Sequence, residues 1–141
     1  MKAYITICDA QENTGSMTAE CEYDYSDNLT MITYDESIEG FEDDCVTSLK
    51  IEKGGPVTLN RTGKYKSEMI FEKNKRHVGC YFTPHGDLMI GIDTYNLEYN
   101  LDKTGGEINI RYNVDCNSDP VSLNDLKISV KVRGNQNVAA C

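Results

Sequence analysis

Apolar and polar residues alternate with a period of two along much of this 141-residue chain. In residues 107–115, and again in residues 126–133, every second side chain is apolar. Such a period buries one face of a β-strand and leaves the other face in water. No stretch has the apolar spacing of an amphipathic helix long enough to cover a core. The sequence therefore predicts an antiparallel all-β protein, either a barrel or a sandwich.

Turn-forming residues divide the chain into about eight to ten short strands. We expect strands at residues 2–8, 19–23, 28–36, 45–52, 57–62, 67–72, 76–83, 88–101, 107–115 and 126–133. Consecutive strands joined by short turns form a meander, and closing a meander on itself removes both exposed edges. The prediction is a single up-and-down β-barrel domain over residues 1–133, followed by a flexible tail at residues 134–141.

The segment at residues 88–101 is too long for one flat strand. Its inward apolar set shifts near Thr94, from Leu88, Ile90 and Ile92 to a second series; that series is Tyr95, Leu97, Tyr99 and Leu101. An extra residue in one strand produces such a shift, so we expect a β-bulge at Thr94.

The net charge excludes one large class of partners. Fourteen basic and 23 acidic side chains give a formal charge of −9. Nucleic acids bind proteins that neutralise phosphates with Lys and Arg, and anionic membrane surfaces attract the same residues. We therefore expect no nucleic-acid or membrane partner. The protein could be a monomer, or a homodimer formed through an uncovered strand.

Six cysteines would allow three disulfides, but no pair has a CxxC spacing. The first nine residues lack the apolar run and cleavage site of a signal peptide, and no segment approaches the length of a membrane helix. These features indicate a cytoplasmic protein, in which we expect free thiols.

Four separated segments resemble a known family. They are residues 34–37 (Tyr-Asp-Glu-Ser), 61–63 (Arg-Thr-Gly), 69–72 (Met-Ile-Phe-Glu) and 81–86 (Tyr-Phe-Thr-Pro-His-Gly). In this order and spacing the chain is similar to the YwiB-like family of small cytoplasmic barrels from Gram-positive bacteria. The resemblance implies a lipocalin-like (calycin) barrel and brings no established activity. The chain has no Trp for the lipocalin Gly-x-Trp signature, and the adjacent Arg111 and Tyr112 point to opposite faces, unlike the Arg-x-Tyr clamp of fatty-acid-binding proteins.

Arg61 is the first candidate for a ligand-binding residue. It continues the inward face defined by Val57 and Leu59, which puts a guanidinium on the core side near a strand end. An unpaired buried charge costs several kcal/mol, so we expect Arg61 to pair with Glu36 or, failing that, Asp35. Three interpretations stay open: a structural ion pair, an arginine that extends to solvent at the strand end, and an anchor for an anionic ligand.

Other polar residues could join Arg61 at the mouth of the barrel. Tyr34 shares a face with Glu36, and Tyr81 shares a face with Thr83. His85 lies in the predicted turn at residues 83–86, where Gly86 would supply a positive φ. Each of these residues can also be explained as barrel lining, rim or solvated turn.

No motif predicts catalysis, a metal or a cofactor. The two histidines are His77 and His85, and His77 is three residues from Cys80, so in a strand the two point to opposite faces. The chain also lacks a G-x-S-x-G nucleophile motif and a calcium loop. The sequence favours a barrel that binds a small ligand, which could be anionic. Two alternatives are a packed barrel that acts in structure or protein interaction, and an enzyme in which Glu36 is the base and Arg61 or Tyr81 stabilises an anion.

Overall fold

The computed structural model describes residues 1–9, 16–36, 45–62, 66–83, 86–116 and 119–132. These residues form ten β-strands, and nearly all of them belong to a strand or to the tight turn between two strands. The strands are β1 (Lys2–Asp9), β2 (Ser16–Asp24), β3 (Leu29–Glu36), β4 (Cys45–Glu52), β5 (Val57–Thr62), β6 (Lys66–Phe71), β7 (Arg76–Thr83), β8 (Gly86–Asp102), β9 (Gly105–Cys116) and β10 (Asp119–Val132). The predicted all-β class is confirmed.

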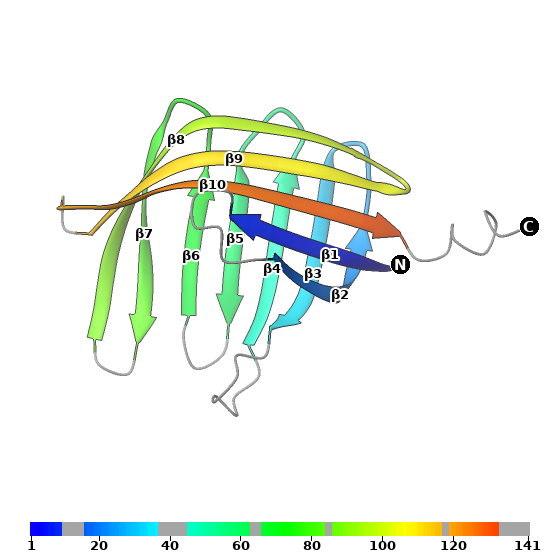
Figure 1. The fold of residues 1–141 in the computed structure, drawn as a ribbon, viewed down its shortest axis with the longest axis horizontal. Coiled ribbons are helices and arrows are strands. Elements are labelled where there is room, and N and C mark those ends of the chain that lie inside the picture. Colours follow the sequence, from blue (N-terminus) through cyan, green and yellow to red (C-terminus); the bar gives the residue numbers. More distant parts are fainter. Residues whose placement is uncertain (10–15, 37–44, 63–65, 84–85, 117–118, 133–141) are drawn as a thin grey trace, which may run out of the picture.

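Each strand pairs antiparallel with its neighbours in the sequence, and β1 pairs with β10 to close a barrel. Ala3 lies opposite Val132 at this closure, and Ile7 lies opposite Ile128. Figure 1 shows the long strands β8, β9 and β10 passing over the shorter strands β4 to β7, so that two walls enclose one interior. This is the predicted up-and-down, lipocalin-like barrel. The predicted tail at residues 134–141 lies outside the described residues.

The bulge in β8 is confirmed, but two residues of the predicted inward series, Leu88 and Tyr95, are exposed (44% and 51%). The register between β8 and β9 shifts between Thr94 and Asn96. Thr94 is only 2% exposed, whereas Tyr95 is 51% exposed and does not belong to the inward series. Tyr95 is the extra residue of the bulge, and such a residue is left out of the pairing. The inward series resumes at Leu97, which packs against the core.

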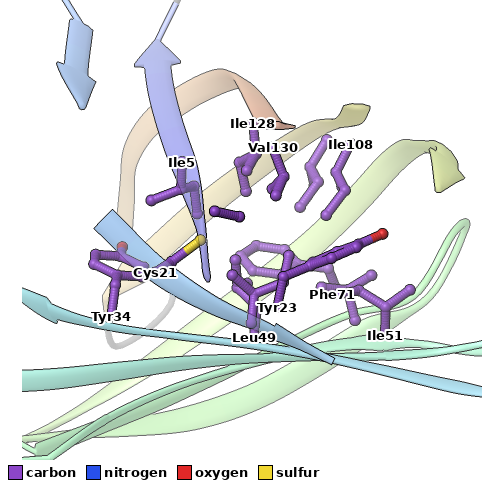
Figure 2. Close-up of a cluster of buried hydrophobic side chains, with 14 of the residues drawn as sticks. Ile5, Cys21, Tyr23, Tyr34, Leu49, Ile51, Phe71, Ile108, Ile128 and Val130 are labelled. Atoms are coloured by element: carbon purple, nitrogen blue, oxygen red, sulfur yellow. The ribbon is translucent and has the colours of Figure 1, made fainter. Parts of the chain in front are cut away.

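The core lies between the two walls of the barrel. Figure 2 shows Ile5, Ile128 and Val130 from one wall facing a layer that contains Tyr23, Leu49 and Phe71. The buried apolar set is Ala3, Ile5, Cys21, Tyr23, Ile32, Tyr34, Leu49, Ile51, Val57, Phe71, Ile92, Ile108, Ile110, Ile128, Val130 and Val132. These residues come from every strand except β7, among the side chains that the structure describes.

Two tyrosine hydroxyls form hydrogen bonds with backbone groups near the turns at one end of the barrel. The hydroxyl of Tyr99 donates a hydrogen bond to the carbonyl of Glu52 (3.0 Å) and accepts one from the N–H of Gly54 (2.8 Å). Gly54 has a φ of +72° in the predicted turn between β4 and β5. The hydroxyl of Tyr23 donates to the carbonyl of Asp102 (2.8 Å), beside the turn between β8 and β9. β5 starts at this end of the barrel, after the turn that contains Gly54. Its last residue, Thr62, therefore lies toward the other end, which we call the opposite mouth.

Candidate functional site

A cavity of about 360 Å³ lies inside the barrel. Seven of the ten strands contribute to its wall, which places it between the two walls and not on the outer surface. The lining residues are Ile7, Tyr34, Leu49, Leu59, Arg61, Met69, Phe71, Ile110, Tyr112, Leu126 and Ile128. Eight of these are hydrocarbon or thioether side chains, two are phenols and one is a guanidinium. Ligand sites commonly combine a mostly apolar wall with a few placed polar groups.

Strand register brings four polar residues to one level of the inner wall. Thr47 on β4 lies opposite Tyr34 on β3 and, on its other side, opposite Arg61 on β5. Arg61 in turn lies opposite Ser67 on β6. Residues directly opposite in antiparallel strands share a face, with Cβ atoms about 4.5–5.5 Å apart. We call Tyr34, Thr47, Arg61 and Ser67 the polar row.

The polar row is well shielded from water. Tyr34, Thr47 and Ser67 are 4%, 0% and 7% exposed, respectively. Arg61 is half-buried, and its Nε atom is buried. Among the described residues that line the cavity, Arg61 alone carries a charge. The alternation that predicted an inward Arg61 after Val57 and Leu59 therefore matches its position in the structure.

The next level of the same wall is apolar, and it lies farther from the end of β5 at Thr62 than the polar row does. It consists of Ile32, Leu49, Leu59 and Met69, which lie opposite one another on β3 to β6. A polar level above an apolar level gives the cavity a direction along the barrel axis. A molecule with a polar head and an apolar body matches this division.

An aromatic pair joins the two walls of the cavity, with Phe71 on β6 and Tyr112 on β9. The rings of Phe71 and Tyr112 are 4.8 Å apart between centroids and tilted by 59°, a favourable arrangement for aromatic side chains. The neighbouring Arg111 is exposed and bonds to Asp125 (3.2 Å) on the outer surface. Arg111 and Tyr112 therefore point to opposite faces, as the sequence predicted.

The other predicted site residues have different outcomes. Tyr34 lines the cavity, and the backbone of Tyr81 lies opposite Ser67, which extends the level of the polar row onto β7. Asp35 is exposed and borders a separate hollow, so it is not the partner of Arg61 that the sequence allowed. The backbone of Glu36 lies two residues beyond Tyr34, opposite Cys45. The remaining predicted features, namely the side chains of Glu36, Tyr81 and Thr83 and the whole of His85, lie outside the described part, so the pairing of Glu36 with Arg61 stays a prediction.

A second hollow, of about 250 Å³, opens between β2 and β3. β2 pairs with β3 only from Asp24↔Met31 to Glu22↔Thr33, whereas β3 pairs with β4 along its whole length. Tyr34 borders both this hollow and the interior cavity. Cys21 lies beside it, and burial raises the pKa of the Cys21 thiol to about 11. Cys8, Cys21, Cys80 and Cys116 are free thiols.

The described residues offer little for acid–base or metal chemistry in the cavity. Nε2 of His77 lies 2.9 Å from a carboxylate oxygen of Glu72, and the hydrogen bonds from His77 and Lys75 lower the pKa of Glu72. This pair is not part of the cavity lining. Within the described ranges, no cluster of three or more His, Cys, Asp or Glu side chains could hold a metal ion.

The chain belongs to a family of barrel proteins defined as a domain of unknown function (DUF1934), whose model matches residues 2–128. The crystal structure of the YwiB protein from Bacillus subtilis has the same fold, with a TM-score of 0.74 over 94% of this chain and 90% of that chain. The two sequences are 18% identical, so this likeness establishes the fold alone. No curated protein matches the chain. The family predicted from residues 34–37, 61–63, 69–72 and 81–86 is confirmed.

The described ranges contain no helix that is long and apolar enough to span a membrane.

Proposed function

We propose that this protein binds a small organic molecule inside the barrel. The interior cavity carries the proposal: about 360 Å³ of space enclosed by apolar side chains, with a guanidinium at one level. Small-molecule sites are typically about 300–1,000 Å³, so this cavity suits a small ligand. Taking about 30 Å³ for each water molecule, the space corresponds to roughly a dozen waters. An apolar space of this size is a poor site for water, because few of its walls offer hydrogen bonds.

The cavity weighs against a barrel that acts only through a packed interior. Natural cores contain few voids larger than one water molecule, since each unfilled volume forfeits dispersion contacts. Eleven side chains from seven strands surround this space without filling it. A packed structural barrel would place larger side chains at Leu59, Leu126 or Ile7.

The free thiols of Cys8, Cys21, Cys80 and Cys116 support a reducing compartment, so we propose the cytoplasm as the location of the protein. A cytoplasmic binding protein would take up metabolites of the cell and not exported compounds.

The test is to look for a bound molecule in protein purified gently from its own cytosol. Native mass spectrometry should show a complex heavier than the polypeptide by the mass of one small organic molecule. Leu126→Trp should lose the extra mass because the indole occupies the cavity. The matched control is Leu123→Trp, since Leu123 is 49% exposed and not part of the cavity lining.

Two results together would reject the proposal. The first is a wild-type protein that carries no extra mass. The second is a panel of small alkyl and aromatic compounds that leaves the methyl NMR signals of Leu49, Ile110 and Ile128 unmoved. That combination would favour the alternative of a packed barrel that acts in structure or protein interaction.

A further inference from the structure

We infer that the ligand is a monocarboxylate whose carboxylate binds Arg61 and whose apolar body lies against the next level of the barrel. This inference rests on the proposed function, and it adds the chemical class and the orientation of the ligand. Its starting point is the position of Arg61 between Thr47 and Ser67 in a cavity that is otherwise nearly apolar.

The guanidinium is suited to bind a carboxylate. It presents five N–H donors in a planar fork that matches the two oxygens of a carboxylate, and such charge-assisted bonds are about twice as strong as neutral ones. A contact of Arg61 with a neighbouring protein group leaves further donors of the fork available. The low local dielectric of the barrel interior strengthens the interaction compared with a surface pair.

The neighbours of Arg61 complete the recognition of a carboxylate. An ionised carboxylate has about four lone-pair sites, more than one guanidinium fills. Thr47 and Ser67 flank Arg61 on the adjacent strands, and Tyr34 lies beyond Thr47 at the same level. Their hydroxyl groups are donors that rotate to suit an acceptor. The polar row therefore offers both charge and neutral donors to one head group.

The charge of the cavity favours a singly charged head group. Arg61 is the one charged residue among the described lining residues. A phosphate monoester carries about −1.5 to −2 charges at neutral pH, so it would leave an excess charge in an apolar space. A carboxylate carries one charge, so it places less negative charge in this space than a phosphate monoester does. The formal charge of −9 on the whole chain also opposes a dianion more than a monoanion.

The apolar body of the ligand has a defined place and size. Leu49, Leu59 and Met69 form the apolar level next to the polar row. Phe71 continues this wall along β6, and its ring packs against Tyr112 of β9, which also lines the cavity. The volume of about 360 Å³ admits a short alkyl chain or a single aromatic ring and excludes a long-chain lipid in extended form.

Calorimetric titration with compounds of equal length tests the inference. The probes are octanoate, 1-octanol, octylamine and octyl phosphate, titrated at pH 7 into the full chain. We expect octanoate to bind at least about tenfold more tightly than 1-octanol, and octylamine and octyl phosphate to bind more weakly than octanoate. Arg61→Met keeps the length and apolar stem of the side chain, and it should remove the preference for octanoate. The control Arg111→Met removes an exposed guanidinium from the outer surface of β9, on the opposite wall, and should retain the preference.

The outcomes separate the two proposals. If 1-octanol binds as tightly as octanoate in the wild type, the carboxylate inference fails while binding in the cavity stands. Tighter binding of octyl phosphate than of octanoate also overturns it, and so does an unchanged preference in Arg61→Met. If none of the four compounds binds, the carboxylate inference fails, and native mass spectrometry with the methyl NMR panel then decides the proposed function separately. Because the comparison of octanoate with 1-octanol uses the wild type, it decides the question even where Arg61→Met does not fold, and Arg61→Lys then tests the fork with the charge retained.

Discussion

Thr47 on β4 lies directly opposite Arg61 on β5, and Thr47 is completely buried. A hydroxyl and a guanidinium on one level of the inner wall form a polar site in a barrel whose other levels are mostly apolar. Buried polar groups in proteins nearly always have hydrogen-bond partners, because burying such a group without one is unfavourable. The account of a bound carboxylate depends on this relationship.

Replacing Thr47 with valine tests the contribution of its hydroxyl. The two side chains have nearly the same shape, so the substitution removes one donor and leaves the packing in place. We expect octanoate to bind several-fold more weakly, by about 1 kcal/mol for one hydrogen bond, with binding of 1-octanol unchanged. Isothermal titration measures both. The matched control is Thr58→Val on β5, which lies opposite Lys50 and Ile70 on the other face. An equal loss for both ligands would show a packing effect instead.

The predicted pairing of Glu36 with Arg61 can be tested with a double-mutant cycle. If the two groups interact, the effects of Glu36→Gln and Arg61→Met on the free energy of unfolding should not add, with a coupling of about 0.5–3 kcal/mol. Urea denaturation of the wild type, both single variants and the double variant gives this coupling. Additive effects would remove Glu36 from the site. If the coupling is present, Glu36→Gln should also strengthen octanoate binding, because it removes a competing carboxylate.

Two buried groups, the thiol of Cys21 and the phenol of Tyr23, should make the free energy of unfolding fall at alkaline pH. Burial raises the pKa of Cys21 to about 11 and that of Tyr23 to about 12. In the folded protein these groups keep their protons at pH values where the unfolded chain loses them, so the unfolded state binds fewer protons. The free energy of unfolding should therefore be constant up to about pH 8 and then fall as pH rises through 9 to 11. Each group contributes on the order of 2 kcal/mol to this decline.

Denaturation in urea at pH 8, 9 and 10 measures the decline. Cys21→Ala should make the slope between pH 9 and 10 shallower, whatever its effect on stability at pH 8. A slope that is the same in the variant and the wild type would contradict the assignment to Cys21. Alkylation followed by peptide mass mapping gives a second check, because a thiol with a raised pKa should react more slowly at pH 8 than the exposed thiols of the unfolded chain.

Gly91 on β8 leaves space for an ion pair on the outer surface. Nη2 of Arg76 donates to Asp115 (2.9 Å), and Nη1 bonds to both Asp115 and Asp93. A Cβ atom at residue 91 would lie 2.1 Å from Nη2 of Arg76 and 2.6 Å from a carboxylate oxygen of Asp115. Gly91→Ala should therefore displace the pair and lower the free energy of unfolding by up to about 1 kcal/mol, the usual range for a partly exposed ion pair.

The control for Gly91→Ala is Gly55→Ala, where the added Cβ would meet its nearest neighbour at an ordinary 3.4 Å. Urea denaturation should find the Gly55 variant within about 0.5 kcal/mol of the wild type. Equal stability of the two variants would mean that the guanidinium moves aside without loss.

The strands could be predicted from the sequence because alternation is a local property. Residues 45–52, 57–62 and 76–83 match the observed strands at both ends, and the bulge at Thr94 follows from a local shift of phase. The outward position of Tyr95 could not be predicted, because a shift of phase does not say which residue is left out of the pairing. The start of β10 at Asp119 was also missed, since the alternation is clear only from Leu126 onward.

The site was predicted in part, for a related reason. Alternation along β5 predicted that Arg61 lies on the inner face. Alternation along β3 predicted that Tyr34 shares a face with Glu36, but whether that face is the inner one depends on the register of β3 with its neighbours. Thr47 and Ser67 were missed because small hydroxyl residues are common on either face of a strand. Their place beside Arg61 follows only from the pairing of β4, β5 and β6, and register between strands depends on the whole barrel. Tyr112 was recognised as opposite in direction to Arg111, but its contact with Phe71 joins strands far apart in the sequence.

The most direct measurement is a crystal structure of the full chain with octanoate. The account predicts density for one molecule inside the barrel, with its carboxylate within hydrogen-bonding distance of Arg61 and its chain against Leu49, Leu59 and Phe71. An interior filled by protein side chains, or octanoate found only on the outer surface, would contradict it.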